Sequence, residues 1–345
     1  MVNLKFLKTK VIDEAVSLLN KYWVEPKHLK YFKARTIDEA VFLLDEHKEA
    51  KIVAGGVDLT RLMESEVIAP KVLVNIGTIP DLVYITEDAE GLKIGPLTTI
   101  SDIEASAIIR DKYSLLAEAA HLVAAPQIRN MVTIGGNLCQ AVNCWYYRKS
   151  PVTGRTFFCY RKGGTTCYAV AGDNRYHAII GGDRCHAVCQ SDMAPALLAL
   201  DARVKIASPS EEKIIPLEEF YTPLGNILKP NELITELQVP ALRHDTKQRY
   251  LKFRLRNAID PPIVGVAAAI TLEAGKVKRA RIVLGGVAPT PYRSIEAEDA
   301  VTGRVITEGI AKTAAKAAVS KAIPLSMNAY KLSITKALVK RAIVS

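Results

Sequence analysis

The chain has 345 residues, of which 49% are hydrophobic and 24% carry a charge. This length and composition predict two or three folded domains and exclude disordered and collagen-like chains, and no apolar run reaches the roughly 18 residues that cross a membrane. The formal net charge of +10 is compatible with binding to nucleic acid, to an acidic protein or to an anionic cofactor, and it does not distinguish these three. Residues 1–13 show neither a separate apolar block nor a cleavage site, so we expect no secretory signal and a cytoplasmic, reducing location.

The first 28 residues are expected to form a helical extension. Residues 12–19, IDEAVSLL, are nearly repeated at residues 37–44, IDEAVFLL, and both segments place apolar residues at helical spacing. Thr36 stands where it can cap the second helix. A repeat of two helices is too short to predict a solenoid.

From residue 51 onward, short strands, glycine turns and helices alternate. The pattern predicts strands at 51–54, 72–76 and 92–94, and helices at 58–65 and 113–123. Residues 140–190 are rich in Gly, Arg, Tyr and Cys and lack a hydrophobic period, so we expect an irregular insert that needs an internal link. Regular structure resumes at 195–200 and 203–207, and residues 208–212 mark a predicted domain boundary.

The last third of the chain carries long strands followed by helices. Strands are predicted at 233–239, 249–255, 263–272 and 277–284, and helices at 307–320 and 328–344. This order predicts an α+β domain with its helices on one face of an antiparallel sheet.

Two diglycine turns are the first candidate binding features. Gly55-Gly56 lies between a predicted strand and a predicted helix, and Gly135-Gly136 follows a second strand-like run. Paired glycines let backbone N–H groups approach a diphosphate closely, and a helix that begins at Asp58 adds its positive end. The chain contains neither G-x-G-x-x-G nor a Walker loop, so we expect neither a Rossmann site nor a P-loop.

Six cysteines lie within 51 residues, from Cys139 to Cys189. In a reducing compartment such clustering more often indicates a metal site than disulfides. Structural zinc sites usually contain closely spaced cysteine pairs, and only Cys139 with Cys144 and Cys185 with Cys189 have that spacing. Residues 140–190 also carry seven Lys and Arg against two Asp, a charge that would offset an anionic iron–sulfur cluster. An iron–sulfur cluster, zinc, and thiols that are merely buried or reactive are the three interpretations.

Four motifs resemble the FAD-binding subunit of the molybdenum hydroxylases, the family of xanthine dehydrogenase and carbon monoxide dehydrogenase. They are KIVAGGVDLTRLM, IRNMVTIGGNLCQA, SDMAPALLALDARVKI and GGVAPTPYR, and the resemblance runs from about residue 29 to the C-terminus. It implies an α+β chain with a PCMH-type (vanillyl-alcohol-oxidase-like) FAD-binding domain of two α/β subdomains at 29–210. A C-terminal α+β domain of the carbon monoxide dehydrogenase flavoprotein type is then expected at 211–345.

The same resemblance implies which residues contact FAD. The two glycine turns would hold the pyrophosphate and ribityl chain, Asp192 would help fix the cofactor, and Ile234 and Arg254 would lie against the flavin ring. The full set is Ala54, Gly55, Gly56, Val57, Asp58, Leu59, Thr133, Gly135, Gly136, Asn137, Asp192, Ile234 and Arg254. Val57 stands where the family usually has a polar side chain, so one phosphate hydrogen bond is missing or comes from the backbone.

The insert is similar to one in the β subunit of 4-hydroxybenzoyl-CoA reductase, a family member that carries an additional 4Fe–4S cluster there. Most relatives separate the two flanking motifs by about ten residues. Here Asn137 and Asp192 are 55 residues apart, so both ends of the insert are expected at the flavin. The cysteines that match the cluster ligands are Cys144, Cys159, Cys167 and Cys185, spaced 15, 8 and 18 residues apart.

Together these features predict an oxidoreductase subunit that transfers electrons and has no catalytic side chain of its own. FAD would join two-electron chemistry to one-electron clusters. A large subunit would hold molybdopterin, a small subunit 2Fe–2S, and ferredoxin or a similar carrier would be the external partner. One alternative is the flavin subunit of a purine or heterocycle dehydrogenase that sends electrons outward. The other is a zinc-stapled protein that binds nucleic acid, which the glycine turns disfavour.

Overall fold

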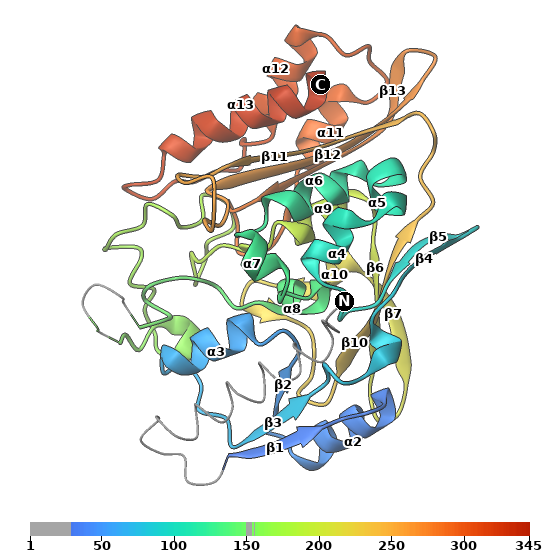
Figure 1. Ribbon diagram of the computed structural model, residues 1–345. Helices are drawn as coiled ribbons and strands as arrows, with labels where there is room; N and C mark the ends of the chain where they lie inside the picture. Colours follow the sequence, from blue (N-terminus) through green and yellow to red (C-terminus); the bar gives the residue numbers. More distant parts are fainter. Residues whose placement is uncertain (1–28, 150–153, 155) are drawn as a thin grey trace.

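The computed structural model describes residues 29–149, 154 and 156–345 (Figure 1). The predicted extension at 1–28, with its helix at 12–19, lies outside the described residues. From the bottom to the top of Figure 1, the chain builds a small parallel sheet, a larger antiparallel sheet with helices, and a second antiparallel sheet with helices of its own. No helix of the described ranges has both the length and the apolar character that a bilayer crossing requires.

The first layer is a parallel sheet with strand order β1-β3-β2. Its elements are β1 (Lys30–Lys33), α2 (Ile37–Glu46), β2 (Lys51–Val53), α3 (Val57–Glu64) and β3 (Val72–Asn75). The Thr36 side chain accepts a hydrogen bond from Glu39 N, which confirms the predicted start of α2. Leu44 of α2 and Val74 of β3 belong to one buried cluster, so the helix packs on this sheet.

The second sheet is antiparallel, with strand order β4-β5-β10-β6-β7. The strands are β4 (Ile85–Asp88), β5 (Gly91–Ile94), β6 (Arg203–Ala207), β7 (Glu212–Pro216) and β10 (Leu233–Pro240). A boundary between residues 210 and 211 would divide this sheet, because β7 and β10 follow that point. We therefore propose that the first domain extends through β10.

Short helices and turns surround the second sheet. They are η1 (Pro80–Leu82), α4 (Ile100–Ala105), α5 (Ala107–Lys112), α6 (Ser114–Leu122), α7 (Pro126–Arg129), α8 (Ile134–Cys139), α9 (Met193–Ala199), α10 (Leu217–Phe220) and the hairpin of β8 (Tyr221–Thr222) and β9 (Gly225–Asn226). The buried apolar cluster around these helices contains Ile100, Leu116 and Leu197, and it extends to both antiparallel sheets.

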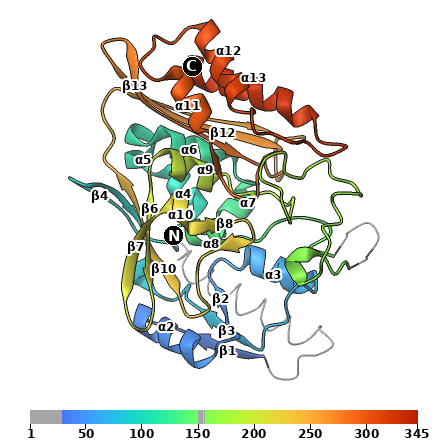
Figure 2. The same cartoon turned by 180° about the vertical axis from the view of Figure 1, so that it is seen from behind.

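The C-terminal layer confirms the predicted antiparallel sheet with helices on one face. It contains β11 (Thr246–Phe253), β12 (Val264–Glu273), β13 (Lys276–Gly285), β14 (Tyr292–Arg293), α11 (Ile295–Val301), α12 (Glu308–Ala317) and α13 (Tyr330–Val344). Helices α6 and α9 of the second layer pack on the other face (Figures 1 and 2). Because both faces are covered, β12 is a nearly continuous apolar run and is buried from Val264 to Thr271.

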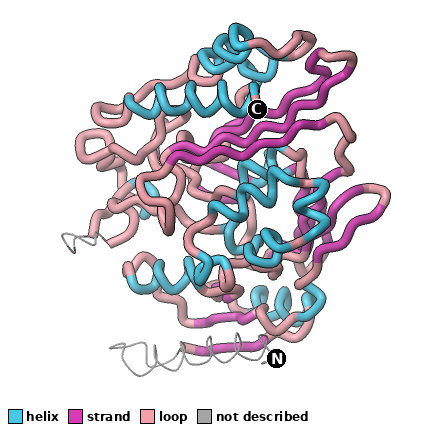
Figure 3. Tube along the Cα trace, turned by 45° about the horizontal axis from the view of Figure 1, so that its top comes forward, coloured by secondary structure: helices cyan, strands magenta, loops and turns pink. Residues whose placement is uncertain are grey.

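The insert is irregular, as predicted, and the C-terminal domain holds its second half. Among its described residues only η2 (Tyr160–Lys162) is helical, and the rest are loops and turns (Figure 3). Asn328 Nδ2 donates to the carbonyl oxygens of His177 and Ala178 at 3.2 and 3.1 Å. Lys331 Nζ lies 3.1, 3.0 and 2.8 Å from the carbonyl oxygens of Tyr176, His177 and Gly286. These bonds replace the backbone pairing that a loop lacks.

Lys331→Met is expected to lower the free energy of unfolding by about 2 kcal/mol, because the carbonyl groups of Tyr176 and Gly286 lose this donor and that of His177 keeps only Asn328. Lys336→Met, on an exposed position of the same helix, is the matched control and is expected to change stability by less than about 0.5 kcal/mol. Urea unfolding of both variants measures the difference. Equal stability of the two variants would show that the hydrogen bonds of Lys331 do not stabilise the fold.

Candidate functional site

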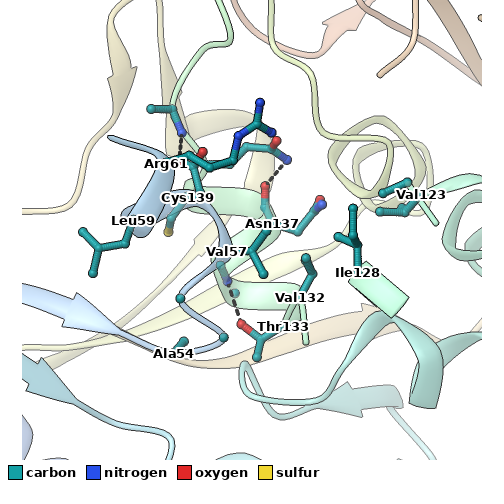
Figure 4. A pocket seen from close by; sticks show the side chains of 18 of the residues that line it. Ala54, Val57, Leu59, Arg61, Val123, Ile128, Val132, Thr133, Asn137 and Cys139 are labelled. Carbon is teal, nitrogen blue, oxygen red and sulfur yellow. Dashed lines mark hydrogen bonds between the residues drawn. The ribbon is translucent and has the colours of Figure 1, made fainter. Parts of the chain in front are cut away.

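A cavity of about 350 Å³ lies where the first sheet, the second sheet and the insert meet (Figure 4). Twelve of the thirteen residues expected to contact FAD line it, and Arg254 does not. The twelve are Ala54, Gly55, Gly56, Val57, Asp58, Leu59, Thr133, Gly135, Gly136, Asn137, Asp192 and Ile234. In Figure 4 the apolar side chains of Val123, Ile128 and Val132 lie across the cavity from Ala54 and Leu59. The cavity therefore has a glycine-rich end and an apolar side.

The first glycine turn joins β2 to α3. Gly56 adopts φ +75° at the position that precedes α3, a conformation that favours glycine, and nothing lies within 4 Å of where its Cβ would be. A Cβ on Gly55 would lie 1.9 Å from the carbonyl oxygen of Met131. No side chain of the described residues caps the start of α3, so its first N–H groups can face a ligand.

The second glycine segment is a short helix where the sequence predicts only a turn. Thr133 Oγ1 accepts a hydrogen bond from Gly136 N at 3.2 Å, and this cap begins α8. Asn137 Oδ1 accepts a hydrogen bond from Ser191 Oγ at 2.6 Å. Asn137 and Ser191 flank the insert, so the two ends of the insert meet at the cavity wall.

Asp192 lines the cavity, but protein groups occupy both of its carboxylate oxygens. Tyr250 Oη donates to Oδ1 at 2.7 Å, and Lys252 Nζ lies 2.8 Å from Oδ2. Burial raises the pKa of this carboxyl, while Lys252 and Tyr250 act in the opposite direction. Through these two contacts Asp192 binds β11 and holds that strand next to the cavity.

Arg254 does not line the cavity, and its expected place beside the flavin ring stays a prediction. Its Nη1 donates to the carbonyl oxygen of Leu122 at 3.0 Å, and Lys252 Nζ donates to the same oxygen at 2.9 Å. Leu122 is the last residue of α6, whose final carbonyl groups have no partner within the helix and attract cations. Ile234, in contrast, is buried in the cavity wall on β10.

Arg148 of the insert also lines this cavity, and the sequence motifs did not identify it. Its Nη2 lies 2.6 Å from Asp58 Oδ1. Its Nε donates to the carbonyl oxygen of Val142 at 3.0 Å. The buried Nη1 has no hydrogen-bond partner among the described residues. Ninety residues separate Arg148 from Asp58, so no local pattern could have predicted the pair.

The four cysteines expected to bind a cluster line a second, small cavity. Cys144, Cys159, Cys167 and Cys185 share it with aromatic rings that include Tyr147 and Tyr160. Cys139 and Cys189 do not line it. Burial raises the pKa of the Cys144 thiol to about 12, and the nearby Cys185 and Cys159 thiols act in the same direction.

His177 contacts this cysteine site. Its Nε2 lies 3.2 Å from Cys144 Sγ, and burial, with Lys331 and His186, lowers the pKa of His177 to about 4. The imidazole is therefore neutral at neutral pH. In the part of the chain that the structure describes, no group of three or more His, Cys, Asp or Glu side chains is arranged so that it could hold a metal ion.

Comparison with protein families accounts for almost the whole described chain. Residues 27–242 match the FAD binding domain in molybdopterin dehydrogenase. Residues 249–345 match the CO dehydrogenase flavoprotein C-terminal domain. The first match ends just after β10, and the second begins within β11.

Individual relatives agree with the family matches. The chain is 33% identical over 298 residues to the FAD-binding subunit of an Escherichia coli aldehyde oxidoreductase, covering 83% of this chain and 88% of the relative. It is 30% identical over 306 residues to subunit alpha of the 6-hydroxypseudooxynicotine dehydrogenase complex of Paenarthrobacter nicotinovorans, covering 87% of each. A carbon monoxide dehydrogenase structure from Hydrogenophaga pseudoflava superimposes with a TM-score of 0.74 at 27% identity, covering 93% of this chain and 98% of that one.

The residues of the large cavity fit FAD. Gly55 lets the two glycine segments touch, and Gly56 leaves space open at the start of α3. The uncapped N–H groups of α3 and the unpartnered Arg148 Nη1 are donors suited to a diphosphate. The apolar side of the cavity suits a planar ring, because ligand cavities are mostly apolar with a few fixed polar groups.

Gly55→Ala is expected to lower the free energy of unfolding by at least about 2 kcal/mol, because the new methyl group would displace the Met131 backbone. Gly56→Ala is the matched control, since it meets open space and costs only the left-handed strain of about 1 kcal/mol. Urea unfolding without added FAD compares them. An equal or smaller loss for Gly55→Ala would contradict the close approach of the two segments.

Proposed function

Because this chain belongs to the FAD-binding subunits of the molybdenum hydroxylase family, we propose that it also carries a 4Fe–4S cluster and passes electrons between that cluster, its FAD and partner subunits. It is the flavoprotein subunit of a molybdoenzyme oxidoreductase. The observation that carries the proposal is the gathering of Cys144, Cys159, Cys167 and Cys185 around one cavity.

The arrangement of the thiols favours a cluster over zinc. A single ion needs its ligands to converge on one point, and the described side chains form no such group. In a 4Fe–4S cluster each thiolate binds a different iron, so the sulfurs lie farther apart around a larger body. Four cysteines that line one shared cavity support such a body.

Cations beside the cavity support an anionic cluster. Arg161 and Lys162 lie over the Tyr147 ring at 5.7 and 5.9 Å from its centre, and Arg184 lies 5.7 Å from the centre of the Tyr160 ring. None of the three cations forms an ion pair with a carboxylate of the described residues. Their charge would favour the thiolate form that iron binds. A hydrogen bond donated by His177 Nε2 to the Cys144 sulfur would raise the reduction potential of the cluster.

The two cofactor sites lie close to each other. A further cavity of about 360 Å³ shares Asn143 and Gln190 with the FAD cavity, and it shares Cys144 with the cysteine cavity. The two proposed sites are thus connected through the residues that line this middle cavity, which supports electron exchange between them. FAD supplies the junction between two-electron and one-electron steps when it is bound.

The proposed partners follow from the family, in which a similar protein is the medium chain of a carbon monoxide dehydrogenase. We propose that a large subunit supplies molybdopterin, a small subunit supplies 2Fe–2S, and ferredoxin or a similar carrier meets the basic insert. In this form the complex is most like 4-hydroxybenzoyl-CoA reductase, with electrons entering through the cluster.

The second candidate function is electron flow in the outward direction, from a heterocycle or aldehyde that the complex oxidises. The dehydrogenase and oxidoreductase names of the relatives favour it. The reduction of the bound cofactors by reduced ferredoxin, or by the substrate of a co-purified large subunit, separates the two directions.

Protein purified without oxygen is expected to contain about one FAD and about four irons per chain. Cys159→Ser is expected to lose most of the iron while it still binds FAD at saturating concentration, because Cys159 lines only the cysteine cavity. Iron and flavin analyses measure both.

Cys189→Ser is the matched control, since Cys189 belongs to the same stretch of sequence but lies outside the cysteine cavity. It is expected to keep its iron. Zinc in place of iron in the unaltered protein, or equal iron loss in the two variants, would contradict the proposed cluster.

A further inference from the structure

We propose that Arg148 binds the diphosphate of FAD, so that the folded insert completes the flavin site. The inference rests on the proposed function, because it assumes FAD in the large cavity and iron at Cys144. It adds a binding residue that belongs to the insert, at a position that none of the four family motifs contains.

The burial and bonding of Arg148 point to a missing anionic partner. Its side chain is only 7% exposed, and two of its three nitrogens have protein acceptors. Nη1 is buried, has no acceptor among the described residues, and belongs to a guanidinium that lines the FAD cavity. A buried donor without an acceptor is costly, and a phosphate oxygen is the acceptor that guanidinium groups bind best.

The position of Arg148 selects the diphosphate over the flavin ring. Its ion pair with Asp58 holds the guanidinium at the second residue of α3, directly after Gly55-Gly56. An unpaired Asp58 carboxylate at this turn would repel phosphates. Arg148 therefore favours diphosphate binding in two ways, because it neutralises Asp58 and contacts the diphosphate directly. Arg148 also supplies a donor at the turn where Val57 has no polar side chain.

The same residue links the FAD cavity to the cysteine site. Arg148 N donates to the carbonyl oxygen of Cys144 at 2.8 Å, and Tyr147 N donates to the same oxygen at 3.0 Å. Cys144 and Arg148 therefore sit at the two ends of one turn. Iron bound at Cys144 would hold this turn in place, and the guanidinium with it. Such coupling is reciprocal, so iron and FAD each strengthen the binding of the other.

The test measures FAD affinity of the full chain, purified with its iron, by flavin fluorescence. Arg148→Gln is expected to weaken FAD binding at least tenfold, as for a lost bond between charged groups. Lys149→Gln is the matched control, because the neighbouring Lys149 is partly exposed and pairs with Glu66 at 2.6 Å. It is expected to leave the affinity unchanged. Equal affinities of the Arg148→Gln variant and the unaltered protein would overturn the inference.

Two further measurements separate phosphate binding from a structural role. ADP, which carries a diphosphate but no flavin, is expected to compete with FAD and to lose the same factor in the Arg148→Gln variant. An unchanged ADP affinity would overturn the assignment to the diphosphate. Asp58→Asn keeps the guanidinium and an oxygen that can accept from it, and removes the charge that would repel a phosphate, so it is expected to lose less FAD affinity than Arg148→Gln. A loss as large as that of Arg148→Gln would mean that the ion pair only supports the fold.

A double-mutant cycle tests whether iron affects FAD binding through Arg148. Cys159→Ser is expected to weaken FAD binding in the unaltered background and to add little in the Arg148→Gln background, because both changes act through the same guanidinium. Additive losses would overturn the link through the turn. Failure of the unaltered protein to bind FAD or iron would instead refute the proposed function, so the two failures are distinguishable.

Discussion

The contact between Gly55 and the backbone of Met131 determines how the site is built. It brings the turn after β2 against the segment that leads into α8, two parts of the chain that are 76 residues apart. The start of α3 and the start of α8 then open into one cavity. Since the insert leaves from the end of α8 and returns to Ser191, which binds Asn137, the irregular loop must begin and end at the cavity wall.

The insert is held by side chains rather than by regular structure. Arg148 fastens its first turn to Asp58, and Asn328 and Lys331 fasten its second half to the C-terminal domain. Buried backbone groups need partners, and in a loop these partners must come from elsewhere. Cys159 and Cys167 lie between these two attachments in the sequence, and Cys144 and Cys185 lie just outside them.

Local signals predicted the elements well, and pairings between distant residues were not predictable. The start of α2 at Thr36 follows from the cap, and strand β6 is found at its predicted residues. α8 escaped prediction because two glycines lower helix propensity, and the Thr133 cap offsets this. A division at residue 210 would separate β6 from β10, and no local pattern encodes the pairing of these two strands. The hydrogen bond from Arg254 to the carbonyl group at the end of α6 is likewise a contact between distant residues.

Electron transfer between FAD and a cluster requires two redox centres in one chain, and a stoichiometric reductive titration without oxygen tests this most directly. FAD accepts two electrons and a 4Fe–4S cluster accepts one, so the isolated chain should take up about three electron equivalents from dithionite. An uptake of about two, with only the flavin absorbance bleached, would contradict the account, because the four cysteines would then hold no redox centre.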